Sequence, residues 1–275
     1  ALPILPNEAR QIINSDAKII NRLGSNALAN YLLVNKGVYA TDEDVPVNPA
    51  TGERMKAANN KNNGYVYMQA GDPIWVDVNG DYIIDDKDKV VVGNSQPRLT
   101  GGFNANLRYK SFSINTNFSF TIKRDIINKA LADRFAAYGN PLSKDLNGSG
   151  AITPIEAFDF WKEDHIYAKY PNPFDYIRGG TADHQVNFFR PDQTLFMEDG
   201  SFLKINGVSI SYVLPKKVLD FLRVERVQLN ASVNNIYTFS KYSGVNPENV
   251  NSLGYDVSGG YPNSRNYTMG VSIDF

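Results

Sequence analysis

The chain closes with Asn266-Tyr267-Thr268-Met269-Gly270-Val271-Ser272-Ile273-Asp274-Phe275, a stretch that alternates without interruption. Successive side chains of a β-strand point to opposite faces of the sheet. The apolar face therefore carries Tyr267, Met269, Val271, Ile273 and Phe275, and the other face carries Thr268, Gly270, Ser272 and Asp274. A strand of a soluble β-sandwich shows this pattern, and so does a transmembrane barrel strand of roughly ten residues. The preceding sequence has to distinguish between the two.

A predicted hairpin over residues 99–122 repeats the pattern. Two alternating runs flank the dipeptide Lys110-Ser111, and only Thr116 interrupts their apolar face. A two-residue link predicts antiparallel neighbours, and it brings Tyr109 and Phe112 together at the turn, where a membrane interface favours aromatic rings. The other face is mainly Asn, Ser and Thr, which suits a water-filled lumen.

Two further strands are predicted over 208–214 and 227–234. The connections between strands alternate in length: 110–111 and 215–226 are short, whereas 123–201 and 241–265 are long, and the first long one begins with a predicted helix over 126–138. Short periplasmic turns and long extracellular loops are typical of outer-membrane barrels. The sequence thus predicts an all-β fold, the C-terminal portion of a transmembrane antiparallel β-barrel whose long extracellular loops contain a short helix.

The predicted organisation has four parts. Residues 1–98 form an extracellular loop region with a possible strand, 99–122 the hairpin, 123–201 a long extracellular loop, and 202–275 three C-terminal barrel strands. Even the smallest membrane barrels have about eight strands, so five or six cannot close one. We therefore expect a fragment, and the start at Ala1, with neither an initiator Met nor a signal region, supports that interpretation.

Composition excludes several functions. Lys and Arg number 28 and Asp and Glu number 29, so no overall charge attracts nucleic acid, and we expect no nucleic-acid partner. Cysteine is absent, which removes disulfides, thiolate metal sites and Cys nucleophiles. The mean hydropathy of -0.35 does not argue against a barrel, because half of each spanning strand can be polar.

Several blocks of sequence carry a resemblance to a known family. They are Ala70-Gly71-Asp72-Pro73 through Gly93-Asn94, the hairpin, Phe202-Leu203-Lys204-Ile205-Asn206-Gly207-Val208-Ser209-Ile210-Ser211-Tyr212, Asn234-Asn235-Ile236-Tyr237-Thr238-Phe239-Ser240-Lys241-Tyr242, Asn246-Pro247-Glu248, and Gly259-Gly260-Tyr261-Pro262 before Arg265. In this order and spacing they closely resemble the C-terminal part of SusC/RagA-type TonB-dependent outer-membrane transporters of Bacteroidetes-like bacteria.

The resemblance implies a barrel of about 22 strands, plugged by an N-terminal domain, in the outer membrane of a Gram-negative bacterium. It implies import of glycans or oligopeptides. The implied partners are a SusD-like surface lipoprotein over the mouth, the remaining N-terminal barrel and plug segment, TonB through a segment absent from this sequence, and outer-membrane lipid. No GxSxG, HExxH or P-loop motif occurs, so we expect neither an enzyme nor an organic cofactor.

The segment 77–88 has the spacing of an EF-hand-like Ca²⁺ loop. Its candidate ligands are Asp77, Asn79, Asp81, the backbone carbonyl of Ile83, Asp85 and Asp88. Position 6, normally Gly, is Tyr82, and position 12 is Asp88 rather than a bidentate Glu. The alternative is an acidic turn that orders itself through Asx hydrogen bonds.

Aromatic residues of the long loop are candidates for contact with substrate or with the lid protein, above all Trp161, Tyr167 and Tyr170. Tyr176, Phe174, Phe188 and Phe189 are of the same kind, and packing of the loops on one another is the alternative for each. The two histidines, His165 and His184, each lie near an Asp, but the spacing defines no geometry for a metal or acid–base site.

Two other functions stay open at this point. One is a secreted, soluble β-sandwich that binds carbohydrate or acts as an adhesin. The other keeps the barrel but makes it a non-importing scaffold within a larger outer-membrane assembly. On the barrel interpretation, the apolar face of 267–275 ends in an aromatic residue that the family implies is an insertion signal, and Phe275→Asp is expected to lower surface abundance.

Overall fold

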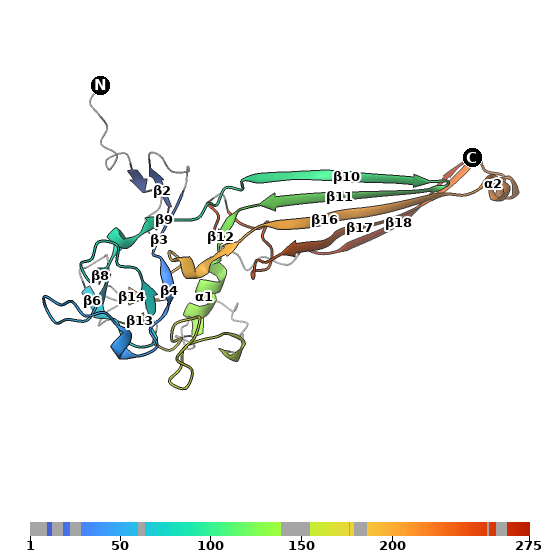
Figure 1. The fold of residues 1–275 in the computed structure, drawn as a ribbon. Helices are drawn as coiled ribbons and strands as arrows, with labels where there is room; N and C mark the ends of the chain where they lie inside the picture. The colour runs from blue at the N-terminus through green and yellow to red at the C-terminus, as the bar shows by residue number, and fades with distance from the viewer. Residues whose placement is uncertain are drawn as a thin grey trace, which may run out of the picture. The chain divides into compact units, whose positions relative to one another are not determined.

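The computed structural model describes residues 10–12, 19–22, 29–59, 64–138, 155–175, 177–178, 186–251, 253–256 and 263–275 (Figure 1). The chain divides into two compact units, each built from three separate stretches. Unit 1 takes residues 1–95, 127–197 and 251–257, and unit 2 takes 96–126, 198–250 and 258–275. The long connections of the sequence therefore contribute to a folded unit.

Unit 2 is dominated by one antiparallel sheet in the order β10-β11-β16-β17-β18. Its strands are β10 (Leu99–Tyr109), β11 (Phe112–Ile122), β16 (Phe202–Val213), β17 (Arg226–Ser240) and β18 (Asn266–Asp274), and helix α2 (Lys216–Leu222) joins β16 to β17. Neighbours in the sheet follow one another along the chain, as in an up-and-down barrel wall (Figure 1). The predicted all-β barrel-wall architecture is confirmed.

Strands β16 and β17 are longer than the alternation of the sequence predicted. The pairing of β16 with both neighbours shifts register at Asn206, and β17 contains Asn235 in the left-handed conformation, with φ 54°. An extra residue at such a bulge exchanges odd and even positions. Leu203 and Ile205 on one side of Asn206 therefore share a face with Val208 on the other. The strict alternation is interrupted at these positions. For this reason the sequence pattern did not predict the first part of β16 and the last part of β17.

Unit 1 consists of short strands, a helix and 3₁₀ turns. The strands are β1 (Arg10–Ile12), β2 (Ile19–Arg22), β3 (Ala29–Leu32), β4 (Asn35–Val38), β5 (Lys56–Asn59), β6 (Gly64–Tyr67), β7 (Pro73–Trp75), β8 (Ile83–Ile84), β9 (Val90–Val91), β13 (Ile177–Arg178) and β14 (Val186–Asn187). The helices are α1 (Lys129–Tyr138), η1 (Asp42–Asp44), η2 (Asp86–Asp88), η3 (Ile155–Ala157) and η5 (Thr194–Phe196). Two paired strands, β12 (Asp125–Ile127) and β15 (Met197–Asp199), contain two of the points where the chain passes from one unit to the other.

Helix α1 begins at Lys129, three residues later than the predicted start at residue 126. The side chain of Asn128 accepts a hydrogen bond from the backbone N–H of Leu131 at 3.0 Å, which is the geometry of a helix N-cap. Ile126 and Ile127 are fully buried and extended instead. Among the described residues, neither α-helix is long and apolar enough to cross a membrane.

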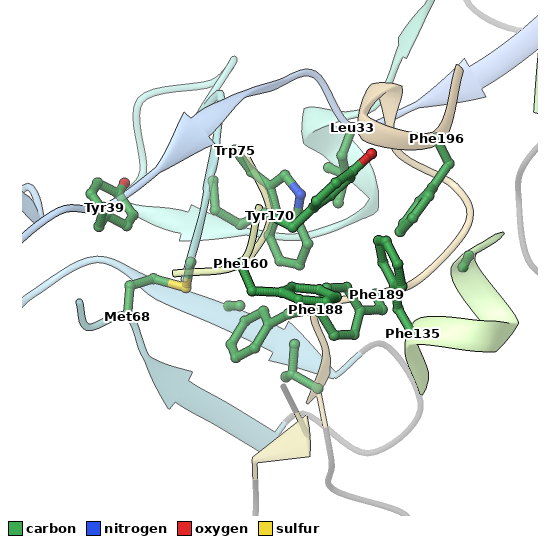
Figure 2. Close-up of a cluster of buried hydrophobic side chains, with 14 of the residues drawn as sticks. Leu33, Tyr39, Met68, Trp75, Phe135, Phe160, Tyr170, Phe188, Phe189 and Phe196 are labelled. Atoms are coloured by element: carbon green, nitrogen blue, oxygen red, sulfur yellow. The ribbon is translucent and has the colours of Figure 1, made fainter. Parts of the chain in front are cut away.

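The core of unit 1 is aromatic and is built around Phe135 of α1. Its ring makes edge-on contacts with Phe160 and Tyr170, both with centroids 4.7 Å away, and a tilted contact with Phe189 at 5.4 Å (Figure 2). Edge-to-face pairs of this kind are favourable because the positive ring edge meets the negative ring face. Segments far apart in sequence thus meet around one ring, which gives the loop region a fixed structure.

Candidate functional site

One face of the five-stranded sheet is apolar from edge to edge. Directly paired residues share a face of a sheet, so the register defines rows across the strands. The complete rows are Tyr109, Phe112, Tyr212, Leu229 and Val271; Leu107, Ile114, Ile210, Ala231 and Met269; and Ala105, Thr116, Val208, Val233 and Tyr267. Beyond the bulge the pattern continues with Phe103, Phe118, Ile205 and Tyr237, and with Gly101, Phe120, Leu203 and Phe239. We call this surface the apolar face.

Much of the apolar face is open to its surroundings. Met269 is 87% exposed, Tyr267 is 68% exposed and Leu107 is 65% exposed. Contiguous apolar surface of this extent is rare on soluble monomers, because its hydration costs about 25 cal/mol per Å². An apolar medium or another protein surface has to cover it.

The opposite face of the sheet is polar but poor in charge. Its rows include Asn106, Asn115, Ser209, Ser232 and Thr268, and Arg108, Ser113, Ser211, Asn230 and Gly270. Some of these side chains hydrogen-bond each other, as Ser119 does with the bulge residue Asn206 at 3.2 Å. A wall with one apolar and one hydrophilic face is what a barrel needs between lipid and an aqueous lumen.

Aromatic rings gather at the end of the sheet where β10 turns into β11. Tyr109 pairs directly with Phe112, as the two-residue link predicted, and Phe112 stacks on Tyr212 with a centroid distance of 4.4 Å. Membrane-spanning proteins concentrate Tyr and Trp at the level of the headgroups. The row from Tyr109 to Val271 thus has the composition of a membrane interface.

The last strand places its predicted signal residues on the apolar face. Tyr267, Met269, Val271 and Ile273 pair with Val233, Ala231, Leu229 and Val227 of β17. Phe275 follows β18 and is 90% exposed. Its role as an insertion signal stays a prediction.

A hollow of about 280 Å³ opens at the other end of the sheet, where the long loops begin. Its lining includes Lys204 of β16, Asn235 of β17, and Tyr242, Asn246 and Arg265 of the loop that follows. These side chains offer amide, hydroxyl, ring and guanidinium groups. The sequence alone does not indicate this hollow, because the motifs that line it form a site only when β17 and the loop after it come together.

Lys204 fixes one wall of this hollow. Its ammonium lies 2.5 Å from a carboxylate oxygen of Glu248, and the lysine side chain is only 10% exposed. Arg265 donates a hydrogen bond to the backbone carbonyl of Ile236 at 2.7 Å. Both contacts tie the loop after β17 to the strands, so the hollow has a defined shape.

The acidic loop 77–88 is ordered by its own backbone. The carboxylate of Asp77 accepts hydrogen bonds from the N–H groups of Gly80 and Tyr82, at 2.7 and 2.8 Å. Asn79 accepts from Asp81, Asp81 from Ile83, and Asp85 from Lys87 in the same manner. Tyr82 takes the left-handed conformation, with φ 62°, that Gly usually supplies at this position of a cation-binding loop.

Asp88 closes the loop from a buried position. Its two oxygens accept hydrogen bonds from the N–H groups of Val78 and Asp85, at 2.9 and 2.8 Å. Burial raises the pKa of Asp88, although these backbone bonds oppose the shift. Over the described residues there is no group of three or more His, Cys, Asp or Glu side chains that could hold a metal ion. The hydrogen bonds match the self-ordered alternative, and Ca²⁺ binding stays a prediction.

The three candidate contact residues of the long loop occupy different environments. Tyr170 is 8% exposed and packs in the aromatic core, so packing explains it. Trp161 donates its indole N–H to the carbonyl of Ala40 at 3.2 Å, and its ring is close enough to Gly71 to leave no room for a Cβ there. Tyr167 is 83% exposed, and its contact with substrate or with the lid protein stays a prediction.

The other aromatic and histidine candidates divide in the same way. Phe188 and Phe189 are buried in the core, whereas Phe174 is 72% exposed. Tyr176 and His184 lie outside the described residues. His165 bonds Asp159 at 2.7 Å on the surface, and this hydrogen bond lowers the pKa of Asp159.

Comparison with known proteins gives this geometry its context. No family model matches the chain. The chain is 26% identical over 216 residues to the TonB-dependent receptor P3 of Formosa agariphila. The match covers 74% of this chain and 19% of that protein. It is also 26% identical over 225 residues to the TonB-dependent receptor SusC of Bacteroides thetaiotaomicron, covering 78% of this chain and 19% of SusC. The chain thus spans about a fifth of the length of these curated relatives.

Solved structures of related transporters resemble the chain in fold. The RagAB peptide transporter structure superposes with a TM-score of 0.64 at 19% identity, over 97% of this chain and 25% of the matched chain. The RagAB peptide importer in its open-open state superposes with a TM-score of 0.61 over the entire chain. The chain is therefore similar in sequence to TonB-dependent receptors, SusC among them, and it shares the fold of the matched part of RagAB. The resemblance to the SusC/RagA type predicted from the motifs is confirmed.

Proposed function

We propose that this chain is part of an outer-membrane TonB-dependent importer that takes up glycans or oligopeptides and works with a SusD-like lipoprotein. The sheet of unit 2 is a segment of the barrel wall, with lipid against the apolar face and water against the polar face. The remaining barrel strands, the plug and the contact with TonB belong to parts of the receptor beyond this chain. The relatives are receptors and transporters, which favours transport over catalysis.

The single observation that carries this proposal is the set of apolar rows across all five strands. In a soluble β-sandwich, the corresponding face packs on a second sheet and is closed to water. Here Leu107, Tyr267 and Met269 are each more than half exposed. The soluble adhesin alternative would leave this surface in water, whereas lipid covers it in the importer.

The loop end of the sheet supplies the proposed contacts with cargo and lid. The hollow at Lys204 and Arg265 lies on the side of the long loops, and its polar lining fits hydrogen-bonding cargo such as a glycan or a peptide. Tyr167 supplies an exposed ring for the lipoprotein lid or for a sugar. RagAB is described as a peptide importer, which is one of the two cargo classes we propose.

Uptake in cells tests import directly. A deletion strain would be complemented with the full-length receptor, and the energised uptake of fluorescent glycan and peptide mixtures would be measured with and without a protonophore. Import predicts uptake that is lost in the deletion, restored by the receptor and abolished by the protonophore. The scaffold alternative predicts that the deletion strain keeps normal uptake but loses an outer-membrane assembly.

Affinity purification of the full-length receptor tests the lid contact. A surface lipoprotein is expected to copurify, and Tyr167→Ala is expected to reduce its amount while Tyr167→Phe retains it. Equal recovery with both variants would remove Tyr167 from the proposed interface.

A further inference from the structure

Helix α2 lies at the end of the sheet where the strands are joined by short connections. It starts three residues after β16 ends and stops four residues before β17 begins, at the same end as the turn between β10 and β11 (Figure 1). A tighter link would suffice to join two antiparallel neighbours. The two helical turns therefore need an explanation other than chain connection.

The helix is amphipathic, and its apolar side is the exposed one. Val218, Phe221 and Leu222 follow the i, i+3, i+4 spacing that places side chains on one side of a helix. Phe221 is 85% exposed, Leu222 50% and Val218 36%. None of the helix residues is buried. An amphipathic helix of a soluble protein turns this side toward the core, so the apolar side of α2 fits an environment outside the chain.

Basic side chains surround this apolar patch. Away from the polar face, the turn end of the sheet carries four of them, Lys110, Lys216, Lys217 and Arg223, against two acidic ones, Asp220 and Glu225. Arg108, Arg226 and Asp274 lie on the polar face of the sheet. The local net charge is therefore positive, although the entire chain has a net charge of -1. On the helix itself, Lys216 lies on the side opposite Phe221, as 100° per residue requires, and Arg223 follows the helix as its left-handed C-cap residue.

We propose that α2 is an interfacial helix that lies among the phospholipid headgroups at the turn end of the barrel wall. Val218, Phe221 and Leu222 enter the boundary of the acyl chains, and the basic side chains bind phosphates of anionic phospholipids. This inference rests on the proposed function, because it needs the sheet to be embedded in a bilayer.

Two observations favour lipid over a protein partner. The apolar patch follows directly along the chain from β16, whose Tyr212 belongs to the aromatic row at the headgroup level. The combination of exposed Phe and Leu with Lys and Arg beside them is the composition of helices that bind anionic membrane surfaces. The strands already hold α2 at the bilayer edge, so two turns are enough for the contact.

Site-directed spin labelling can test this placement. The sequence contains no cysteine, so single cysteines can be placed at Phe221, Asp220 and Met269 of the full-length receptor, after replacement of any cysteine outside this chain. Each labelled variant would be reconstituted into phosphatidylcholine bilayers with and without phosphatidylglycerol. Collision of the label with oxygen and with a water-soluble nickel chelate would be measured.

The proposal predicts that a label at residue 221 is accessible to oxygen and protected from the chelate, whereas a label at residue 220 is open to the chelate. Phosphatidylglycerol is expected to strengthen the protection at residue 221, and the combined substitutions Lys216→Gln, Lys217→Gln and Arg223→Gln are expected to abolish that gain. Equal chelate access at residues 220 and 221 in both bilayers would overturn the proposal. Protection that appears in native membranes but not in lipid bilayers would overturn it in favour of a protein partner.

The label at Met269 separates this inference from the proposed function. If residue 269 is protected while residue 221 is not, the membrane wall stands and only the interfacial helix is wrong. If neither is protected, the membrane wall itself is wrong.

Discussion

Lys89 and Asp192 form an ion pair inside unit 1, with 2.7 Å between the ammonium nitrogen and a carboxylate oxygen. The side chain of Lys89 is closed to solvent and that of Asp192 is 2% exposed. Arg190 binds the same carboxylate with two hydrogen bonds, at 2.6 and 2.7 Å. The pair joins the segment before β9 to the segment before η5, so it helps to fix the loop region.

Asp192→Asn is expected to destabilise unit 1 by about 3–5 kcal/mol, because it leaves a buried ammonium without full compensation. Hydrogen exchange of the full-length receptor in detergent measures this, at amides such as that of Leu33, which donates to the backbone carbonyl of Asp192. Asp133→Asn is the matched control, since it removes an exposed pair with Lys129, and it is expected to cost less than about 1 kcal/mol. Equal effects of the two variants would contradict the assigned role of the buried pair.

Acid is expected to weaken unit 1 through the same carboxylate. Burial alone would raise the pKa of Asp192, but Arg190 and Lys89 outweigh it and hold the pKa well below its ordinary value. A depressed folded-state pKa contributes stability above the unfolded-state pKa of about 3.9, and this stability is lost as the pH falls toward the folded-state value. The midpoint temperature of unfolding, measured from about pH 6 down to pH 3, should therefore begin to decrease once the pH is below about 5. The Asp192→Asn variant should show a shallower slope, and an unchanged slope would contradict this source.

Truncation of Tyr170 is expected to destabilise the protein far more than truncation of Tyr167. Tyr170→Ala opens a cavity beside Phe135 and is expected to destabilise unit 1 by about 3–5 kcal/mol, the range for large aromatic truncations. Tyr167→Ala removes an exposed ring and is expected to change stability by less than about 0.5 kcal/mol. Thermal unfolding of both variants checks this. A large loss from Tyr167→Ala would show that its ring packs against the protein.

Calcium binding by loop 77–88 can be tested by removing the ion. If the loop holds a structural Ca²⁺, a chelator should lower the melting temperature and increase hydrogen exchange at Gly80 and Tyr82, and added Ca²⁺ should reverse both. Asp81→Asn tests the candidate ligand set, with Asp133→Asn as a control outside the loop. No change with the chelator would leave the backbone hydrogen bonds of Asp77 and Asp88 as the sufficient cause of the loop's order.

Period-two alternation made the sheet predictable, and its failure at bulges set the limit. Each strand of the five-stranded sheet was found at least in part from the sequence, and the pairing of Tyr109 with Phe112 followed from a two-residue link. The extra residue Asn206 and the left-handed Asn235 interrupt the alternation, so the loop-side parts of β16 and β17 were missed.

Unit 1 was much less predictable, because its order comes from long-range contacts. Its aromatic core joins residues that are far apart in sequence, namely Phe135, Phe160, Phe189 and Phe196. No local sequence pattern predicts that these rings are in contact. The burial of Tyr170 and the hollow beside Lys204 also depend on tertiary contacts, so they could not be predicted from local sequence patterns. The Asx turns of loop 77–88 depend on short-range spacing and were foreseen as an alternative.

The central claim is that the apolar face of the sheet meets lipid, and a spin-label scan along β18 tests it most directly. Single labels at Tyr267, Thr268, Met269, Gly270, Val271 and Ser272 of the full-length receptor in bilayers would be assayed for collision with oxygen and with a water-soluble nickel chelate. We predict strict alternation, with the odd positions exposed to oxygen in lipid and the even positions open to the chelate. Equal chelate access at odd and even positions would contradict the claim.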